Sequence, residues 1–410
     1  MITLGQASNY SVGQVFRHLF AWGSKNDSVA LRQALAVRYD AKIEDVALYH
    51  TGRSALAVAI TEAAQHRPYH VIVPGLTCIA VVRAVRAAGC EPVFVDIEPD
   101  TLAYNLQKLE QKLKSLQSQA VPTSVGATLK NPIDKNGKVC YNGSIILVQN
   151  TLGISWNVSK IEGIANKYGA LIVEDLAHSA GRKYPDGREV GTVGATAALS
   201  FGKGKAIDII SGGAVIVCRH DKNNLNATSS PTPPNSSANL DHLAELPQPT
   251  QKPKLSDRLR DRWYPFLGLI CRAIWRIGFG KALMCLFVKL RWVQRSADAE
   301  LNTKHRLTHW QAKLALRQLQ HLPTNRLRDY RLVQERTKVL SKLHQNGYNF
   351  DEIWYDTPVS PRRYADEADF PTQECPETIT IANQIINLPT WYKPDKLAKA
   401  YKIIKKYEVN

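Results

Sequence analysis

Three short stretches carry residue types suited to covalent and acid–base chemistry. The stretch SFGKGKAIDIISGG (200–213) places Lys203 and Lys205 in a glycine-rich turn after an apolar run. A partly desolvated, deprotonated lysine forms a Schiff base with a carbonyl compound. The stretch LIVEDLAHSAG places Asp175 at the end of another apolar run. TGRSALAVAI (51–60) reads as a tight turn that feeds a helix, and free N–H groups at such a helix start bind phosphate.

Each feature also has an ordinary structural explanation. Asp175 is suited to cap a following helix, a lone lysine is usually a solvated surface group, and Thr51 or Ser54 is suited to be a helix cap. Together, however, an amine for an aldehyde, a carboxylate for a ring nitrogen and an anion cup describe a site for pyridoxal 5'-phosphate (PLP). The carboxylate would hold the pyridinium proton through a charge-assisted hydrogen bond.

The elements that must position these residues form an alternating pattern between about 44 and 220. Helical stretches at 77–89 and 158–169 separate some of the short apolar runs, and each ends at a glycine. Most runs are apolar on both faces, as in parallel strands that helices cover on both sides. Such an α/β open sheet gathers functional groups at the carboxyl ends of its strands. The predicted strands are VIVP (71–74), PVFVDI (92–97), SIILVQN (144–150), ALIVED (170–175), AALSF (197–201) and AVIV (214–217).

The remaining sequence predicts further units in this chain of 410 residues. An Asn-, Ser- and Pro-rich stretch reads as a low-complexity loop. Helices at 306–322, 325–347 and 394–407 and a strand at 383–391 predict a smaller α+β domain. The predicted division is a large domain at 1–220 with an N-terminal arm of about 1–40, the loop at 221–256, a basic helical insertion at 257–295 and the C-terminal domain at 296–410.

The formal charge of +17 is concentrated in one segment. Residues 251–295 contain eleven Lys/Arg and two Asp, and Arg258, Arg262, Arg272 and Arg276 fall on one side of an amphipathic helix. A transmembrane span is disfavoured because Arg272 and Arg276 would sit near its centre. Peripheral contact of 257–295 with the inner membrane face remains an alternative to packing on this chain or on a partner subunit. We expect no nucleic-acid partner, since no nucleic-acid module accompanies the basic segment.

Cysteine usage and the N-terminus bear on the compartment. The seven cysteines are scattered and form no CxxC pair, which argues against a disulfide framework and against a zinc site. The first twenty residues lack the pattern of a signal peptide. We therefore expect a cytoplasmic protein without a bound metal.

The order of the motifs resembles a known family. TGRSALAVAI, LVQNTLG, VEDLAHSAG, SF-x3-K-x6-GG and the late NQIINLPTW make the chain similar to the DegT/DnrJ/StrS group of PLP-dependent, mostly nucleotide-sugar, aminotransferases. The resemblance covers roughly 40–220 and 296–408. It implies the aspartate aminotransferase fold (fold type I), with a mostly parallel seven-stranded sheet between helices and a smaller C-terminal domain.

The resemblance also implies roles for particular residues. Lys205, five positions after Ser200, would bind the cofactor covalently, and Asp175 would hold the pyridine nitrogen. His178 would lie near the cofactor ring, so the implied catalytic residues are Lys205, Asp175 and His178. The other implied cofactor-binding residues are Gly52, Arg53, Ser54, Cys78, Asn150 and Ser200. Lys203 has no assigned role, and we expect a solvated or phosphate-side charge.

Four positions depart from the family pattern. Arg53 stands where threonine is usual, Cys78 where an aromatic residue stacks on the ring, and Ser211 where an acid often precedes the glycine pair. An asparagine that the partner subunit usually contributes would be Lys304 or a shifted Asn302. These departures bear on the substrate and leave the lysine–aspartate pair intact.

The resemblance implies a homodimer with its active sites at the subunit interface. We expect it to transfer an amino group, from glutamate, to a nucleotide-linked keto-sugar in surface-polysaccharide or secondary-metabolite biosynthesis. Alternatives are a PLP-dependent sugar dehydratase, disfavoured because Lys205 is retained, and a non-catalytic regulatory or binding protein of the same fold.

Overall fold

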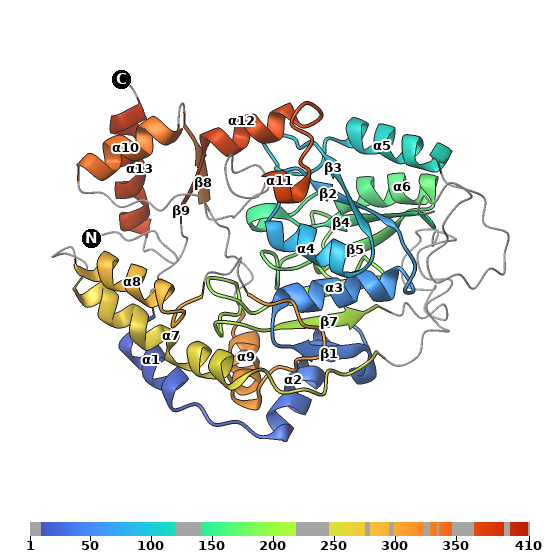
Figure 1. Cartoon of the computed structure of the whole chain (residues 1–410). Helices are drawn as coiled ribbons and strands as arrows, with labels where there is room; N and C mark the ends of the chain where they lie inside the picture. Colours follow the sequence, from blue (N-terminus) through green and yellow to red (C-terminus); the bar gives the residue numbers. More distant parts are fainter. Residues whose placement is uncertain are drawn as a thin grey trace.

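The computed structural model describes residues 10–119, 141–218, 246–274, 279–294, 299–322, 329–333, 336–346, 365–388 and 394–408. A seven-stranded sheet lies between helices, and a two-stranded unit lies near the C-terminus (Figure 1). The strands of the large sheet are β1 (Val46–Tyr49), β2 (His70–Pro74), β3 (Glu91–Val95), β4 (Ser144–Val148), β5 (Leu171–Asp175), β6 (Thr196–Ser200) and β7 (Gly213–Val217).

The strand order is β1-β7-β6-β5-β4-β2-β3, and only β7 pairs antiparallel with its neighbours. The prediction of a mostly parallel seven-stranded sheet is therefore confirmed. All six predicted strand runs coincide with β2 to β7 within one or two residues. The edge strand β1, only four residues long, was not among those runs.

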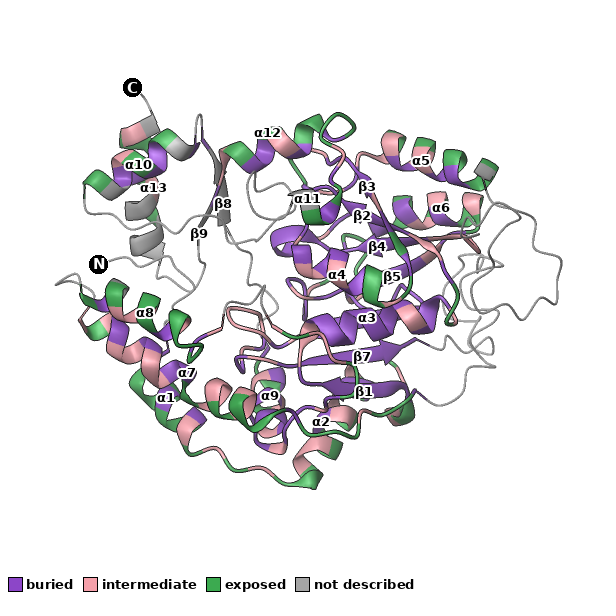
Figure 2. Ribbon diagram, in the orientation of Figure 1, coloured by how far each residue is buried: buried purple, intermediate pink, exposed green. Residues whose placement is uncertain are grey.

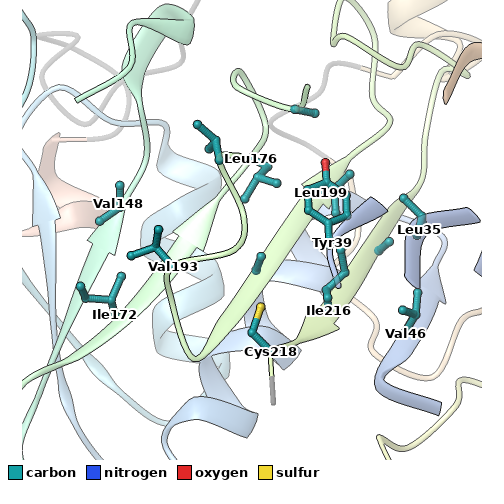
Figure 3. Close-up of a cluster of buried hydrophobic side chains, with 14 of the residues drawn as sticks. Leu35, Tyr39, Val46, Val148, Ile172, Leu176, Val193, Leu199, Ile216 and Cys218 are labelled. Carbon is teal, nitrogen blue, oxygen red and sulfur yellow. The ribbon is translucent and has the colours of Figure 1, made fainter. Parts of the chain in front are cut away.

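Helices cover both faces of the sheet, as the doubly apolar strands require. One face carries a buried cluster that includes Leu35, Leu199 and Ile216 (Figure 3), and the other packs against the helix that begins at Gly52. The burial colours show the strands as the most enclosed part of the molecule (Figure 2). The covering helices are α2 (Lys25–Arg38), α3 (Gly52–Ala63), α4 (Ile79–Ala87), α5 (Leu106–Gln119), α6 (Val158–Tyr168) and α9 (His309–Gln320).

The helix ends follow local chemistry. The Asn157 side chain accepts a hydrogen bond from the Lys160 backbone N–H at the start of α6, which satisfies one of the free donors there. Gly169 ends α6 in the left-handed conformation, with φ of 63°, where glycine has no steric penalty.

The basic segment forms two helices, α7 (Leu255–Ala273) and α8 (Phe279–Lys289). They pack on the N-terminal helix α1 (Val12–Leu19) through a buried cluster that includes Val15, Tyr264 and Phe287. The inner side of the insertion thus packs on its own chain. Of the helices in the described ranges, none is long and apolar enough to cross a membrane. Residues 219–245 of the predicted low-complexity loop lie outside the described residues.

The C-terminal region corrects one prediction. Residues 325–347 were expected to form a single helix, but Asp329–Leu332 is a strand, β8, and only Arg336–Gln345 is helical, α10. β8 pairs antiparallel with β9 (Ile385–Leu388). The long-range partner makes a strand of a stretch that reads locally as helix.

The rest of the C-terminal region includes α11 (Ala365–Ala368), α12 (Pro376–Gln384) and α13 (Pro394–Glu408). The strand predicted at 383–391 and the final helix at 394–407 correspond to β9 and α13. α9 packs against α2, in the apolar cluster of the large sheet. The domain boundaries given above stay predictions.

Candidate active site

The candidate active site lies where β5, β6 and α3 converge. β5 ends at Asp175 and β6 ends at Ser200, and the two strands are parallel neighbours. α3 begins at Gly52, and the loop after Ser200 carries Lys205. The carboxyl ends of β5 and β6 therefore bring together a carboxylate, an amine and a helix start that are far apart in sequence.

Asp175 is a buried carboxylate, only 6% exposed. Its Oδ1 accepts a hydrogen bond from the Ala177 backbone N–H at 2.9 Å. Residues 177–181 form turns and not a helix, so Asp175 caps a turn. Burial raises the pKa of Asp175, while the Ala177 hydrogen bond and the positive charge of Lys205 act in the opposite direction. The two groups named by the sequence are thus close enough to interact electrostatically.

Local hydrogen bonds fix the conformation of the loop that carries Lys205, the lysine loop. The Lys205 backbone N–H donates to the Gly202 carbonyl at 3.1 Å, and Gly204 has φ of 70°. The Asp208 carboxylate accepts from the Gly204 N–H at 2.7 Å and from the Tyr10 hydroxyl at 2.6 Å. Asp208 therefore fixes the shape of the loop that presents Lys205. Its position inside a glycine-rich loop was the only sequence signal for this role.

The start of α3 and the end of β6 approach each other very closely. A Cβ atom on Gly52 would lie 2.4 Å from Ser200 Oγ and 2.6 Å from Ser200 Cβ, so only glycine fits there. The Thr51 side chain caps α3 by accepting a hydrogen bond from the Ser54 N–H at 3.1 Å. The result is a helix start with a hydroxyl beside it, a donor set suited to phosphate.

Three predicted cofactor residues lie on loops at strand ends. Cys78 is the N-cap of α4, where its Sγ accepts from the Ala80 N–H at 3.4 Å. His178 lies in the turn after Asp175 and is 9% exposed. Asn150 is buried, and its Oδ1 accepts from the Trp156 N–H at 2.8 Å. Asn150 thus shapes its own loop, and cofactor contacts by all three stay predictions.

Residues 41–226, just under half of the chain, match the model of the DegT/DnrJ/EryC1/StrS aminotransferase family. The similarity to that family is confined to this part of the chain. The match contains every predicted cofactor-binding residue from Gly52 to Lys205, and the resemblance given above is confirmed.

Two curated enzymes are similar in sequence to part of this chain. The chain is 26% identical over 166 residues to L-glutamine:2-deoxy-scyllo-inosose aminotransferase of Streptomyces kanamyceticus, and that match covers 40% of this chain and 33% of the relative. It is 27% identical over 165 residues to GDP-perosamine synthase of Escherichia coli O157:H7, a match that covers 40% of this chain and 38% of the relative. The matched region is thus about a third of each relative's length.

A solved structure extends the similarity of the fold to the whole chain. A Streptococcus pneumoniae protein in its PLP form superposes with a TM-score of 0.59 and 14% sequence identity. The superposition covers 98% of this chain and 96% of that one. The expected fold, that of the PLP-dependent aminotransferases, is therefore confirmed beyond the family region.

Arg53, which departs from the family pattern, is turned toward residues that follow the insertion. Its Nη1 donates to the Ala299 carbonyl, and the side chain is 9% exposed. The Asn302 backbone N–H donates to Ser54 Oγ at 3.0 Å, and the Asn302 side chain accepts from the Lys304 N–H at 2.9 Å. Segment 299–304 of the same chain therefore braces the start of α3.

Ser211 also departs from the family pattern, but a carboxylate from another segment of the chain lies beside it. The Ser211 hydroxyl donates to the Asp261 carboxylate of α7, and the Gln311 side chain donates to Ser211 Oγ at 2.9 Å. His50 Nε2 lies 3.6 Å from Asp261 Oδ2. The insertion thus delivers a carboxylate next to the glycine pair of the lysine loop. The sequence held no signal for this contact because it joins residues 50 apart.

Lys203 is not the solvated charge that was expected, while its position relative to a bound phosphate stays a prediction. Its Nζ donates to the Gln294 carbonyl at 2.7 Å and lies 3.8 Å from the centre of the Tyr264 ring. Burial lowers the pKa of Lys203 to about 8, against the opposing charges of Asp261 and Asp208. The side chain is directed into the insertion because the inserted helices cover the position where solvent was expected.

Proposed function

We propose that the protein is a PLP-dependent aminotransferase that transfers an amino group to a keto-sugar. The observation that carries the proposal is that the buried carboxylate of Asp175 ends β5, while Lys205 lies in the loop that directly follows the parallel neighbouring strand β6. Both residues lie at the carboxyl ends of these strands, beside the place where Gly52 and Ser200 are in close contact.

The residues present fit the cofactor. The Gly52–Ser200 approach, which a Cβ would block, allows the backbone N–H groups at the start of α3 to reach a phosphate. Asp175 would hold the protonated ring nitrogen, and Lys205 Nζ would bind the aldehyde carbon. The Streptococcus pneumoniae protein with the same fold exists in PLP and PMP forms, which supports this choice of cofactor.

The roles of the chain's own groups follow from this placement. Bound PLP supplies an electrophilic carbon and an electron-withdrawing ring. Asp175 would place a negative charge at the ring nitrogen, where the buried setting strengthens the interaction. The Lys205 amine would serve as the base that takes the donor Cα proton and as the acid that returns it. The start of α3 and the Ser200 hydroxyl would hold the phosphate.

The substrate class rests on the relatives. One is named for a cyclic keto-sugar-like acceptor and an L-glutamine donor, and the other for a GDP-linked sugar. We propose a nucleotide-linked keto-sugar acceptor, with glutamate as the donor and glutamine as the second donor to test. The corresponding role is in surface-polysaccharide or secondary-metabolite biosynthesis.

The test compares two lysines that are two positions apart. Native protein loaded with PLP should be yellow, and an amino donor should bleach the colour. Lys205→Ala should lose both the lysine-bound absorbance and turnover, whereas Lys203→Ala should keep the absorbance. Retention of the lysine-bound absorbance by Lys205→Ala would overturn the assignment.

The same experiment separates the alternatives. A dehydratase would consume the sugar without transfer of nitrogen from a labelled donor. A non-catalytic protein would bind PLP without bleaching by glutamate or glutamine. A deaminated donor and an aminated sugar in equal amounts are the products expected of the aminotransferase.

We also propose a cytoplasmic homodimer with active sites at the subunit interface. The proposal rests on the family resemblance and, for the compartment, on the scattered cysteines. One chain has a mass of 45.7 kDa, and light scattering of the purified full chain should give twice this value. A monomer that turns over at the full rate would contradict a shared site.

A further inference from the structure

A surface outside the candidate active site combines large exposed aromatic side chains with cations. Phe16, Phe20 and Trp22 are 56%, 75% and 83% exposed. Phe16 and Phe20 stack with ring centroids 6.0 Å apart. Side chains of this size are seldom so exposed without a partner surface when they cluster.

Two cavities flank Trp22. One of about 240 Å³ and one of about 460 Å³ share Ala21 and Trp22 in their walls. The residues that line them include no Asp or Glu. Asp27 is electrostatically close to Lys313 and Arg317 but lines neither cavity. The cations in the two walls are Lys252, Arg258, Arg262 and Arg306 in the first and Arg17, Lys313 and Arg317 in the second.

One of these cations, Arg262, is held in place by contacts with its own chain. Arg262 donates to the Leu19 and Ala21 carbonyls at 3.2 and 2.9 Å and lies 4.9 Å from the Trp310 ring centre. It therefore holds the segment that carries Trp22. Burial, followed by the charges of Arg306 and other nearby cations, lowers the pKa of His309 in the first cavity, which is consistent with a positive potential there.

Helix α7 continues this surface. Leu255, Leu259 and Trp263 recur every fourth residue and are 63%, 48% and 47% exposed. Arg258 and Arg262 each precede one of them in sequence, so a cationic row and an apolar row run side by side along the helix. We call this surface the basic aromatic face. It consists of the exposed aromatic and apolar side chains of α1, its following loop and α7, together with the cations of the two cavities. Its members are Phe16, Phe20, Trp22, Leu255, Leu259, Trp263, Arg17, Lys252, Arg258, Arg262, Arg306, Lys313 and Arg317.

We propose that the basic aromatic face docks on an anionic lipid bilayer. Aromatic rings are favoured at the level of the lipid headgroups, and nearby Lys and Arg are attracted to anionic headgroups. A second copy of the chain fits less well, because a two-fold contact would place this face against itself and oppose like charges. The contact is peripheral, since no helix within the described ranges is suited to cross a membrane.

The test is sedimentation of the full, PLP-loaded chain with vesicles. Vesicles of phosphatidylcholine plus phosphatidylglycerol should bind the protein, and phosphatidylcholine alone should bind it much more weakly. Added salt should weaken the binding, because it screens charge. Replacing three cations, as Arg17→Gln/Lys313→Gln/Arg317→Gln, should lower the affinity for anionic vesicles on the order of a hundredfold. Phe20→Ser/Trp22→Ser should reduce binding about tenfold or more.

Matched variants serve as controls. Lys114→Gln/Lys160→Gln/Lys183→Gln removes the same charge from exposed sites on and near α5 and α6, which lie far from α1 and α7 (Figure 1). Val37→Ser replaces a side chain that is 74% exposed on α2. Both should bind vesicles as the native chain does.

Three results would overturn the proposal. The first is no preference for anionic vesicles, or equal losses in the control variants. The second is a dimer that Phe20→Ser/Trp22→Ser dissociates while vesicle binding persists, which would assign the face to a second copy. The third is RNA that displaces the protein from vesicles and binds more tightly than they do.

Discussion

At the scale of single residues, contacts with other segments assign different roles to two neighbouring lysines. Lys205 acts on the Asp175 carboxylate at the sheet edge, whereas Lys203 is covered by Tyr264 and Gln294 of the insertion. Both are lysines in the same glycine-rich loop, so residue type alone does not separate them. Their surroundings do, because the charged form of an amine is disfavoured where water is excluded.

We predict that Lys203→Met changes the pH dependence of stability. Burial lowers the pKa of Lys203 to about 8, whereas the unfolded chain has the ordinary lysine value of about 10.4. Between these values the unfolded state binds more protons, so the free energy of unfolding rises with pH. Urea denaturation at about pH 7.5 and about pH 10 should show that Lys203→Met loses this rise, on the order of 2 kcal/mol.

The control for Lys203→Met is Lys160→Met, at an exposed lysine of α6. It should leave the slope of stability against pH unchanged. Equal slopes for the native chain and Lys203→Met would show that Lys203 titrates normally.

We predict that Gly52→Ala destabilises the protein, because its new Cβ would collide with Ser200 at 2.4 Å. Overpacking of this kind costs about 1–3 kcal/mol. Gly163→Ala in α6 is the matched control: its Cβ meets nothing within 4 Å, and alanine in a helix should gain about 0.5–1 kcal/mol over glycine. Urea denaturation of the cofactor-free protein measures both, and equal effects would refute the close approach.

At the scale of elements, α7 is tied to the candidate active site by one carboxylate. Asp261 accepts from Ser211 and, at 3.3 Å, from Gln311 Nε2, which joins α7 to the lysine loop and to α9. The outer side of the same helix carries the exposed row of Leu255, Leu259 and Trp263. One helix therefore links the lysine loop to the basic aromatic face.

We predict that Asp261→Ala loosens α7 while the sheet stays intact. The change leaves buried hydroxyl and amide partners without their acceptor, at a cost of about 1–3 kcal/mol. Hydrogen exchange should rise in residues 255–273 and stay low in the strands. Asp257→Asn, which removes a half-buried i,i+3 pair with Arg260 on the same helix, should change stability by less than about 1 kcal/mol. Unchanged protection of α7 in Asp261→Ala would contradict the anchoring role.

At the scale of the whole molecule, Asp96 joins the C-terminal unit to the large sheet. Its Oδ1 accepts from the Thr378 N–H and hydroxyl of α12, both at 2.8 Å. Its Oδ2 accepts from Lys108 of α5 at 2.7 Å. Burial alone would raise the pKa of Asp96, but the hydrogen bonds from Lys108 and Thr378 prevail and lower it.

We predict that this junction weakens in acid. The pKa of Asp96 is lower in the folded than in the unfolded state, so its contribution is present above the unfolded value of about 3.9 and is lost as pH falls through the folded pKa. Asp96→Asn should cost about 2 kcal/mol at neutral pH and much less in acid. Limited proteolysis at neutral pH and in acid measures how readily the C-terminal unit is released in each variant.

Asp186→Asn is the control for Asp96→Asn, because Asp186 pairs with Arg188 within one surface loop of the large unit. It should leave the release of the C-terminal unit by protease unchanged. Protease resistance of Asp96→Asn equal to that of the native chain at neutral pH would refute the junction.

Particular elements show how far sequence reasoning reached. The runs at β2 to β7 were predictable because strands buried on both faces are apolar throughout. β1 escaped because four residues carry too little pattern, and β8 was read as helix because its partner β9 lies more than 50 residues away. Asp175 was found because it ends an apolar strand, and the family resemblance selected Lys205 over Lys203. Asp208 and Asp261 were not, because their partners are distant in sequence.

The sequence by itself determined the sheet and the resemblance to the family, and it supplied the proposed lysine–aspartate pair. These depend on local apolar patterns and on motifs that lie within residues 41–226. The tertiary structure alone decided the place of Lys203, the acid beside Ser211 and the joining of α1 to α7 in one surface. Each of these depends on which distant segments pack together, and packing follows from the shape of the whole fold and not from any single stretch of chain.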